Sequence, residues 1–210
     1  MLRVAVRLPP APGRIGDWLP DVTALEAAGA DTVWLEAKTA AAEPWILLGA
    51  AAAVTHRVRL GCLLGTIVAG AAAGRLDGLD TLATLCAGRV VVGVRPGPLV
   101  GRLKGRSDAS ILLICRTRGE ATRSARLADG VILPGAIDDV RSLRADGEAA
   151  FELWVDAAVP SDRSGWATLI ASLEAAGATG VIVPWDPRLI DLLRSAGEPD
   201  DRSDLLIATG

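Results

Sequence analysis

Basic residues that could hold an anion gather in one stretch of this sequence, from residue 95 to residue 126. Eight basic residues stand there against two acidic ones, so the stretch carries +6 in a chain whose net charge is −3. The eight are Arg95, Arg102, Lys104, Arg106, Arg116, Arg118, Arg123 and Arg126. Guanidinium groups bind phosphate oxygens in pairs, so Arg95, Arg116 and Arg118 are candidates for holding a phosphate-bearing ligand. A solvated surface is the alternative, because runs of charge are commonly exposed faces.

Groups suited to proton transfer or nucleophilic attack are few. Glu36 and Lys38 follow one apolar run and would transfer protons if buried, with an exposed ion pair as the alternative. Cys62 and Cys115 lie near the ends of two other runs, where a thiol would line a ligand site, although a buried cysteine is more often an inert apolar residue. The sequence shows no Ser/His/Asp arrangement, no paired carboxylates and no metal-type spacing around its three cysteines and single histidine. Catalytic residues beyond Glu36 and Lys38 are therefore unknown, and no metal is expected.

Two further residue types admit a functional and a structural interpretation. Trp34, Trp154 and Trp185 lie in or just after apolar runs, where they would stack on a flat ring or pack in the core. His56 precedes an apolar run instead of following one. We therefore expect His56 to have a surface or capping role.

Eight short apolar runs would position these side chains. They are Leu2 to Leu8, Thr32 to Glu36, Val58 to Leu64, Val90 to Val94, Ile111 to Cys115, Gly130 to Leu133, Phe151 to Val155 and Gly180 to Val183. Segments with helical spacing separate them, and strand-helix alternation repeated eight times is typical of a closed parallel barrel. The sequence therefore predicts an α/β protein with a (β/α)8 barrel of the TIM type. In such barrels the chemistry lies at the C-terminal ends of the strands.

One helix-strand unit occurs near each end of the chain. Pro20 opens a helix that Gly29 closes, and an apolar stripe from Trp166 to Leu173 ends at Gly177. Both units contain the hexapeptide LEAAGA. We interpret the repeat as two helices that solve the same packing problem rather than as a duplication, because alanine allows close packing and glycine adopts the left-handed closing conformation.

Length and composition bound the remaining possibilities. The chain has 210 residues, of which 50% are hydrophobic, and we expect one barrel domain over residues 1–197 with a tail over residues 198–210. We expect a cytoplasmic protein that does not enter a membrane, because no apolar run approaches the roughly 18 to 20 residues that span a bilayer. The mild negative charge and the absence of aromatic residues from the basic stretch argue against a nucleic-acid partner. We expect a small-molecule partner.

Four blocks carry a resemblance to a known family. They read LEAAGADTVWLE, EPWILLGAAAAVTHRVRLGCLLG, LATLCAGRVVVGVRPG and ILLICRTRGEATRSARLADGVILPG. In this order and spacing the chain resembles the luciferase-like flavin-dependent oxidoreductases, a family that includes monooxygenases and deazaflavin-dependent enzymes. The resemblance implies FMN or a 5-deazaflavin of the F420 type at the C-terminal mouth, with its phosphate near the turn after strand five. Together with the basic stretch and the cysteines at the ends of strands three and five, it gives the candidate cofactor-binding residues Cys62, Gly93, Arg95, Cys115, Arg116, Thr117, Arg118 and Gly119.

The chain also departs from that family's pattern. Ala37 and Lys38 stand where an acidic residue and a histidine are usual, and Arg95 stands where a second glycine follows Gly93. The connection after strand four is short, so the barrel is compact. Three functions remain open: an active oxidoreductase or monooxygenase, a non-catalytic flavin-binding or subunit-like barrel, and a lyase or isomerase acting on a phosphorylated metabolite. We also expect a homodimer, formed through apolar helix faces such as Trp45 to Val54.

Overall fold

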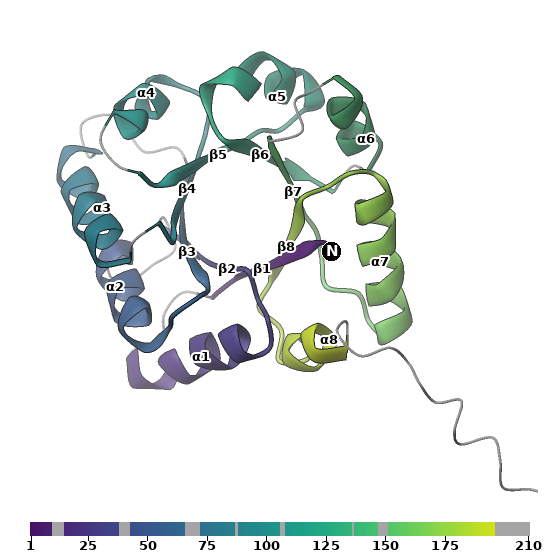
Figure 1. Ribbon diagram of the computed structural model, residues 1–210, viewed down its shortest axis with the longest axis horizontal. Coiled ribbons are helices and arrows are strands. Elements are labelled where there is room, and N and C mark those ends of the chain that lie inside the picture. The colour runs from purple at the N-terminus through teal and green to yellow at the C-terminus, as the bar shows by residue number, and fades with distance from the viewer. Residues whose placement is uncertain are drawn as a thin grey trace, which may run out of the picture.

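Eight parallel strands close into a barrel in the computed structural model (Figure 1). The structure describes residues 1–9, 15–37, 43–65, 72–86, 88–105, 108–135, 137–146 and 151–195. Strand β1 pairs with both β2 and β8, which closes the sheet, and a helix follows each strand on the outside of the barrel. The predicted (β/α)8 barrel is confirmed. The expected tail at residues 198–210 lies outside the described residues.

The strands lie within one residue of the apolar runs that predicted them. They are β1 Arg3–Arg7, β2 Thr32–Glu36, β3 Arg59–Gly65, β4 Val90–Val94, β5 Ser110–Ile114, β6 Gly130–Pro134, β7 Glu152–Asp156 and β8 Gly180–Pro184. The α-helices are α1 Leu19–Ala27, α2 Pro44–Val54, α3 Ala72–Cys86, α4 Pro98–Lys104, α5 Arg118–Ser124, α6 Ile137–Asp146, α7 Arg163–Ala175 and α8 Leu189–Ser195. Short 3-10 turns, η1 Ile15–Asp17 and η3 Ala125–Leu127, precede α1 and follow α5.

The two LEAAGA segments form the same closing turn. Gly29 after α1 has φ +94° and Gly177 after α7 has φ +84°. Residues other than glycine rarely adopt this backbone conformation. The following amides of Ala30 and Ala178 donate to the carbonyl oxygens of leucines five residues earlier, both at 3.0 Å. The predicted helix ends are thus confirmed, and each turn delivers the chain directly into the next strand.

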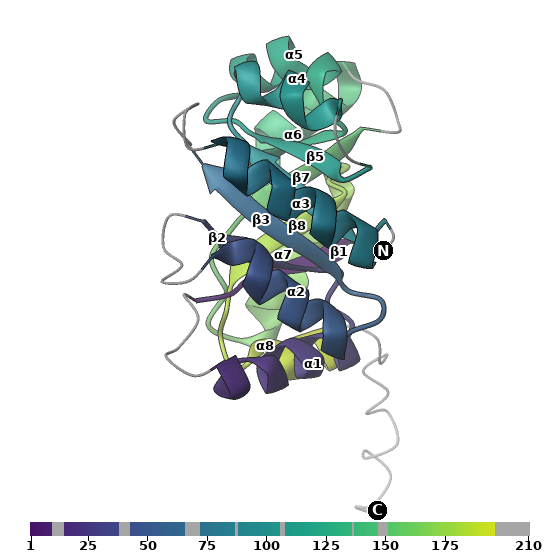
Figure 2. The same cartoon turned by 90° about the vertical axis from the view of Figure 1, so that its left-hand side faces the viewer.

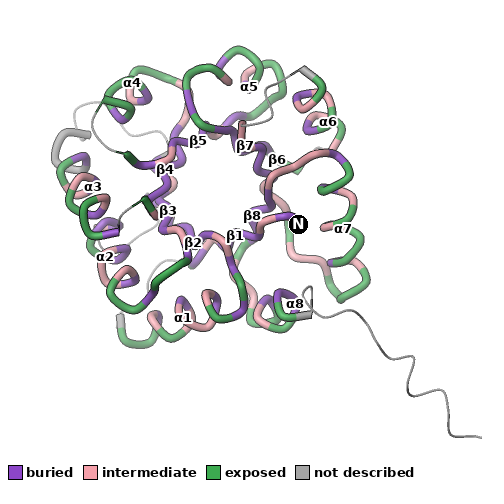
Figure 3. Tube along the Cα trace, viewed as in Figure 1, coloured by how far each residue is buried: buried purple, intermediate pink, exposed green. Residues whose placement is uncertain are grey.

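The core has two layers, seen in Figure 3 as buried strands inside a ring of helices with exposed outer faces. The larger layer lies between the sheet and the helices, where alternate strand residues such as Val4 and Val33 meet helix residues such as Val22. The smaller layer fills the barrel itself. It comprises Ala5, Trp34, Val91, Leu112, Ile132, Trp154 and Ile182.

Two tryptophans fill the barrel because glycines face them. A Cβ atom on Gly61 would lie 2.4 Å from the Trp34 ring, and one on Gly180 would lie 2.3 Å from the Trp154 ring. Both indoles are almost fully buried, with 0% and 1% of their surfaces exposed. Of the two interpretations open to these residues, the structure favours core packing. Trp185 is half-buried against the outer layer.

Helix α2 turns most of its apolar side chains inward. Trp45, Leu47, Leu48 and Ala51 are buried, whereas Ile46 is 70% exposed. Figure 2 shows α2 beside α3 on the outside of the barrel, and the two helices are in contact. The expected homodimer stays a prediction. In the described part of the chain, no helix has the length and apolar character needed to cross a membrane.

Candidate functional site

Three charged side chains meet at the C-terminal mouth of the barrel. Arg7, Glu36 and Asp156 end β1, β2 and β7, each two residues after a member of the barrel interior, so strand alternation turns them inward. Nη2 of Arg7 donates to Oδ1 of Asp156 at 2.6 Å, and Nη1 donates to Oε1 of Glu36 at 3.3 Å. We call these three residues the mouth triad. Between 22% and 36% of each side chain is exposed, so the triad is accessible to a ligand.

The turn after β5 is closed by its own side chains. Thr117 caps α5 by accepting from the Glu120 amide at 3.2 Å, and Oε2 of Glu120 accepts from the Arg116 amide at 2.8 Å. This is a variant of the capping box, in which a hydroxyl and a carboxylate three residues apart satisfy the first amides of a helix. A phosphate at this turn would therefore find the Arg116 amide already taken, whereas the side chains of Arg116 and Arg118 are exposed.

The basic stretch is divided between the two ends of the barrel. Arg95 directly follows β4, and Arg116 and Arg118 follow β5, which pairs with β4, so these three arginines share one edge of the mouth. Arg102 and Lys104 lie in the last turn of α4, which leads back to the opposite end. Arg123 and Arg126 occupy the end of α5 and the following η3 turn. Arg106 and the proton-transfer candidate Lys38 lie outside the described residues.

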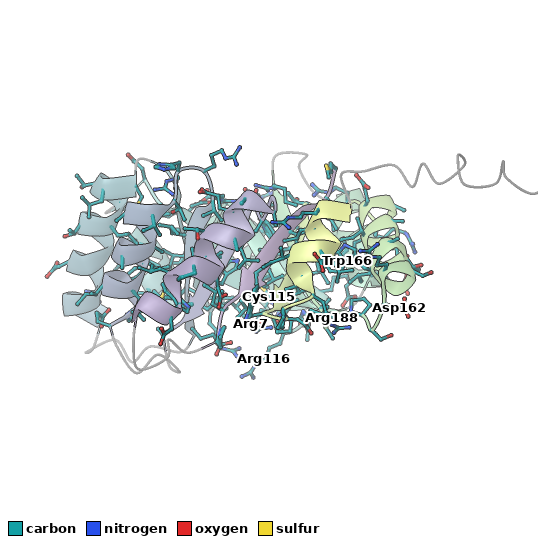
Figure 4. The ribbon with its side chains drawn as sticks, turned by 90° about the horizontal axis from the view of Figure 1, so that it is seen from below. Arg7, Cys115, Arg116, Asp162, Trp166 and Arg188 are labelled. Carbon is teal, nitrogen blue, oxygen red and sulfur yellow. The ribbon has the colours of Figure 1, made fainter. Side chains whose placement is uncertain are left out.

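Figure 4 shows the labelled side chains of Arg7 and Arg116 toward the same end of the barrel. Arg95 is half-buried, as is Glu36, the second proton-transfer candidate, whose carboxylate accepts from Arg7. The structure thus places Arg95, Arg116 and Arg118 in the connections after the adjacent strands β4 and β5, and Glu36 at the end of β2.

The remaining cofactor candidates belong to packed regions. Cys62 and Cys115 are buried in the layer between the sheet and the helices rather than in the barrel interior. Burial, with a smaller contribution from the Glu120 carboxylate, raises the pKa of the Cys115 thiol to about 12. A Cβ atom on Gly93 would lie 2.5 Å from Leu63, so this glycine makes room for packing inside the barrel. Gly119 lies exposed in the first turn of α5.

The loops after β7 and β8 are fastened to each other. The guanidinium of Arg188 donates to both oxygens of Asp186, at 2.9 and 2.7 Å, and to the Ser161 carbonyl oxygen at 2.7 Å. Hydrogen bonds from Arg188 lower the pKa of Asp186 to about 2. Asp162 caps α7 by accepting from the Gly165 amide at 2.7 Å. Because these donors already serve the chain's own oxygens, the edge formed by β4 and β5 is the better place for an external anion.

The opposite end of the barrel carries a denser ionic network. Glu152 of β7 lies 3.2 Å from Arg3 and 3.4 Å from Arg59, and it accepts from the Trp154 indole at 2.7 Å. Asp31 lies 3.8 Å from each arginine. Burial opposes ionisation of Glu152, but the indole and the two arginines outweigh it and hold the pKa of Glu152 below its ordinary value.

His56 also lies at this N-terminal end, exposed, as expected from its position before β3. Its amide and those of Arg57 and Val58 all donate to Oε1 of Glu26, at 2.8, 2.6 and 2.9 Å. Two surface hollows of about 450 and 560 Å³ also open here, the first lined by Ser110 and Asp129 among others and the second by Glu26, Asp31 and Arg59 among others.

Sequence reasoning missed two members of the mouth triad, Arg7 and Asp156. Each ends a strand that also begins with a charge, Arg3 in β1 and Glu152 in β7. An apolar strand with charges at both inward-facing ends is the signal that could have identified them, because such charges must pair inside the barrel.

The donor set at the mouth fits the phosphate of a flavin-type cofactor better than it fits a metal ion. Three guanidinium groups line one edge, and such groups match phosphate geometry. Among the described residues, no group of three or more His, Cys, Asp or Glu side chains could hold a metal ion.

Comparison with known proteins gives likenesses in structure only. No family model matches the chain, and no curated protein matches its sequence. The coenzyme F420-dependent tetrahydromethanopterin reductase from Methanopyrus kandleri is 11% identical, with a TM-score of 0.69 over 94% of this chain and 97% of that one. An F420-dependent secondary alcohol dehydrogenase in complex with an F420-acetone adduct is 13% identical, with a TM-score of 0.72 over 93% and 98%.

A third likeness has a different chemistry. Ligand-free tryptophan synthase from M. tuberculosis is 15% identical, with a TM-score of 0.67 over 92% of this chain and 90% of that one. F420-dependent enzymes are thus among the structural neighbours, in agreement with the resemblance to luciferase-like oxidoreductases. At these identities the likenesses establish the fold that this chain shares with all three: a (β/α)8 barrel.

Proposed function

We propose that the protein binds a phosphate-bearing flavin or 5-deazaflavin cofactor at the C-terminal mouth of the barrel and acts as an oxidoreductase. The observation that carries the proposal is the edge formed by Arg95, Arg116 and Arg118 at the ends of the adjacent strands β4 and β5. The sequence resemblance supports the proposal, as does the presence of F420-dependent enzymes among the structural neighbours.

The chain would bind the cofactor and exclude water from the barrel interior beneath it. The three arginines would hold the phosphate through their side chains, since guanidinium groups match phosphate geometry and Glu120 already accepts from the Arg116 amide. Beneath the mouth, Trp34 and Trp154 fill the barrel and exclude water. The bound cofactor would supply the redox chemistry, so few catalytic side chains are required.

Titration of the purified protein with FMN and with an F420-type deazaflavin tests the proposal. Absorbance of the cofactor and quenching of tryptophan fluorescence report binding. Replacing Arg116 and Arg118 together with alanine should weaken binding by roughly tenfold or more, because each lost guanidinium removes charge-assisted hydrogen bonds. Arg102→Ala is the matched control, because Arg102 belongs to the same basic stretch but lies in the last turn of α4. Equal affinity in all three proteins, or binding of neither cofactor, would overturn the proposal.

A specific observation favours a second candidate, a non-catalytic barrel. The Glu120 carboxylate lies at the turn where the resemblance places the cofactor's phosphate, and a like charge there weakens anion binding. In this case the protein would bind either cofactor weakly and would not reoxidise its reduced form in the presence of electron acceptors. Steady turnover with any acceptor would exclude it.

A cytoplasmic homodimer accompanies the proposed function. Light scattering at micromolar concentration should give about twice the chain mass of 21.6 kDa. A mass of one chain would contradict the dimer without affecting the cofactor proposal.

A further inference from the structure

We propose that Arg7 and Asp156 form a binding site for a neutral, hydroxyl-bearing group on the floor of the mouth. The inference names the substrate class for the site described above and in that sense rests on the proposed function.

The two residues present a donor and an acceptor side by side. Nη2 of Arg7 lies 2.6 Å from Oδ1 of Asp156, so one small ligand atom can approach both groups at once. They come from β1 and β7, whose next inward-facing residues, Ala5 and Trp154, lie deeper in the packed interior. With 26% and 36% of their side chains exposed, Arg7 and Asp156 form the boundary between that interior and solvent.

Hydrogen-bonding capacity remains on both side chains. A guanidinium carries five N–H groups, and Arg7 uses two of them, for Glu36 and Asp156. An ionised carboxylate has about four acceptor positions, and within the described part of the chain Asp156 receives a side-chain hydrogen bond from Arg7 alone. A ligand can therefore accept from Arg7 and donate to Asp156 without displacing either of the existing bonds.

A hydroxyl group matches this pair at a single oxygen, because it accepts and donates together. Ions match it less well. An anion that approaches Arg7 meets the carboxylates of Glu36 and Asp156. An ammonium group is attracted by those two carboxylates, but it only donates, so it leaves the remaining N–H groups of Arg7 without an acceptor. Partly buried charges are screened less than exposed ones, so the repulsion disfavours anions, and of the three kinds of group only the hydroxyl uses both Arg7 and Asp156.

The site is fixed in place before a ligand arrives. Arg7 is held from two sides, by β2 through Glu36 and by β7 through Asp156, and the strands themselves are paired in the barrel. A binding group held on strands loses little conformational freedom when it binds, which favours affinity for a small molecule.

Saturation-transfer NMR on the cofactor-free protein tests the inference with three probes of similar size. The probes are propane-1,2-diol, sodium propionate and propylammonium chloride. The diol should bind most tightly of the three. Asp156→Asn should weaken diol binding roughly tenfold, because it removes the charge from the acceptor and one anchor of Arg7.

Two further variants keep the result interpretable. Glu152→Gln makes the equivalent change on the same strand at the other end of the barrel and should leave diol affinity within about twofold of wild type. Arg7→Lys keeps the positive charge but lacks the fork that reaches both carboxylates, so it should also weaken diol binding. Circular dichroism checks that each variant is folded.

The outcomes separate this inference from the cofactor proposal. Diol binding that is lost in Asp156→Asn and kept in Glu152→Gln supports the inference, whether or not either cofactor binds. Absence of diol binding, equal binding in both variants, or tighter binding of propionate or propylammonium overturns it, even if a cofactor binds at the arginine edge.

Discussion

The two ends of the barrel use the same strands and the same kinds of charge in different ways. At the N-terminal end, two arginines face Glu152 and Asp31, and the Trp154 indole adds a further hydrogen bond to Glu152. At the C-terminal end, Arg7 bridges Glu36 and Asp156, and solvent reaches all three. Strands β1 and β7 contribute to both arrangements.

The difference indicates which end is built for stability and which for binding. Glu152 receives hydrogen bonds or ion pairs from three groups, so its carboxylate is satisfied within the N-terminal network. Arg7 and Asp156 keep unused donor and acceptor positions at the end where (β/α)8 enzymes place their sites. The following predictions test this contrast.

The largest loss of stability should come from disturbing the packed interior that lies between the two ends of the barrel. A Cβ atom on Gly180 would lie 2.3 Å from the Trp154 ring and 2.7 Å from the Arg3 carbonyl oxygen. Gly180→Ala should therefore destabilise the protein by about 3 kcal/mol, measured by urea unfolding. Gly101→Ala, on α4 where a Cβ atom meets nothing within 4 Å, should be neutral or stabilising by up to about 1 kcal/mol. Equal stability of the two variants would contradict this account of the interior.

The second effect compares the carboxylates at the two ends of β7. Glu152→Gln removes the carboxylate charge that pairs with the partly buried Arg3 and Arg59. It should lower the free energy of unfolding by about 2 kcal/mol. Asp156→Asn weakens one contact in a more exposed group and should cost about 1 kcal/mol or less. If Asp156→Asn proved the more destabilising, the C-terminal triad would be the structural network and our assignment of the two ends would be reversed.

The third effect is the pH dependence of stability. The pKa of Glu152 is lower in the folded than in the unfolded chain, so the unfolded chain binds more protons between those two values and stability rises with pH there. The contribution is fully present above the ordinary glutamate pKa and is lost as the pH falls through the folded value. Urea unfolding between pH 3 and pH 7 should show a smaller acid loss in Glu152→Gln than in wild type; parallel curves would contradict the prediction.

Glu26 should add to the same acid loss. Burial opposes its ionisation, but three backbone hydrogen bonds outweigh that effect and keep the pKa of Glu26 below its ordinary value. Glu26→Gln should therefore also reduce the dependence on pH below about 4.5, although less than Glu152→Gln because Glu26 is closer to solvent.

The smallest effect concerns the thiol near the mouth. Burial raises the pKa of Cys115 to about 12, so at pH 8 the native protein should not react with iodoacetamide at this residue. All three cysteines are buried thiols, and each should react after unfolding in urea. Mass spectrometry of the labelled peptides gives the result. Labelling of Cys115 in the native protein would show that the C-terminal end opens more than its packing indicates.

Sequence reasoning predicted the architecture because the fold is encoded locally. Each strand is a short apolar run, and helices α1 and α7 are followed by glycines in the left-handed conformation, which glycine adopts most readily. These signals need no knowledge of distant contacts. The barrel follows from their number and order.

The site was only partly predictable, because it depends on pairing across the sheet and on which way each side chain faces. Arg7 and Asp156 are 149 residues apart, so nothing in either segment indicates their contact. Parallel strands are apolar on both faces, so the sequence could not tell that Cys62 faces the helices while Gly61 faces the barrel. The capping pair Thr117 and Glu120 has a recognisable spacing. The same segment also matched the turn where the resemblance places the cofactor's phosphate, so the spacing alone did not identify the cap.

Inside the barrel each large tryptophan packs against a glycine, and this pairing limits which substitutions the interior can accept. Trp34 occupies the space left at Gly61, and Trp154 occupies the space left at Gly180. A larger residue at either glycine requires a smaller one at its tryptophan, and a smaller tryptophan substitute without a compensating change leaves a void under the mouth. Among homologous barrels these positions should therefore covary in pairs, and the depth available to a ligand should change in discrete steps.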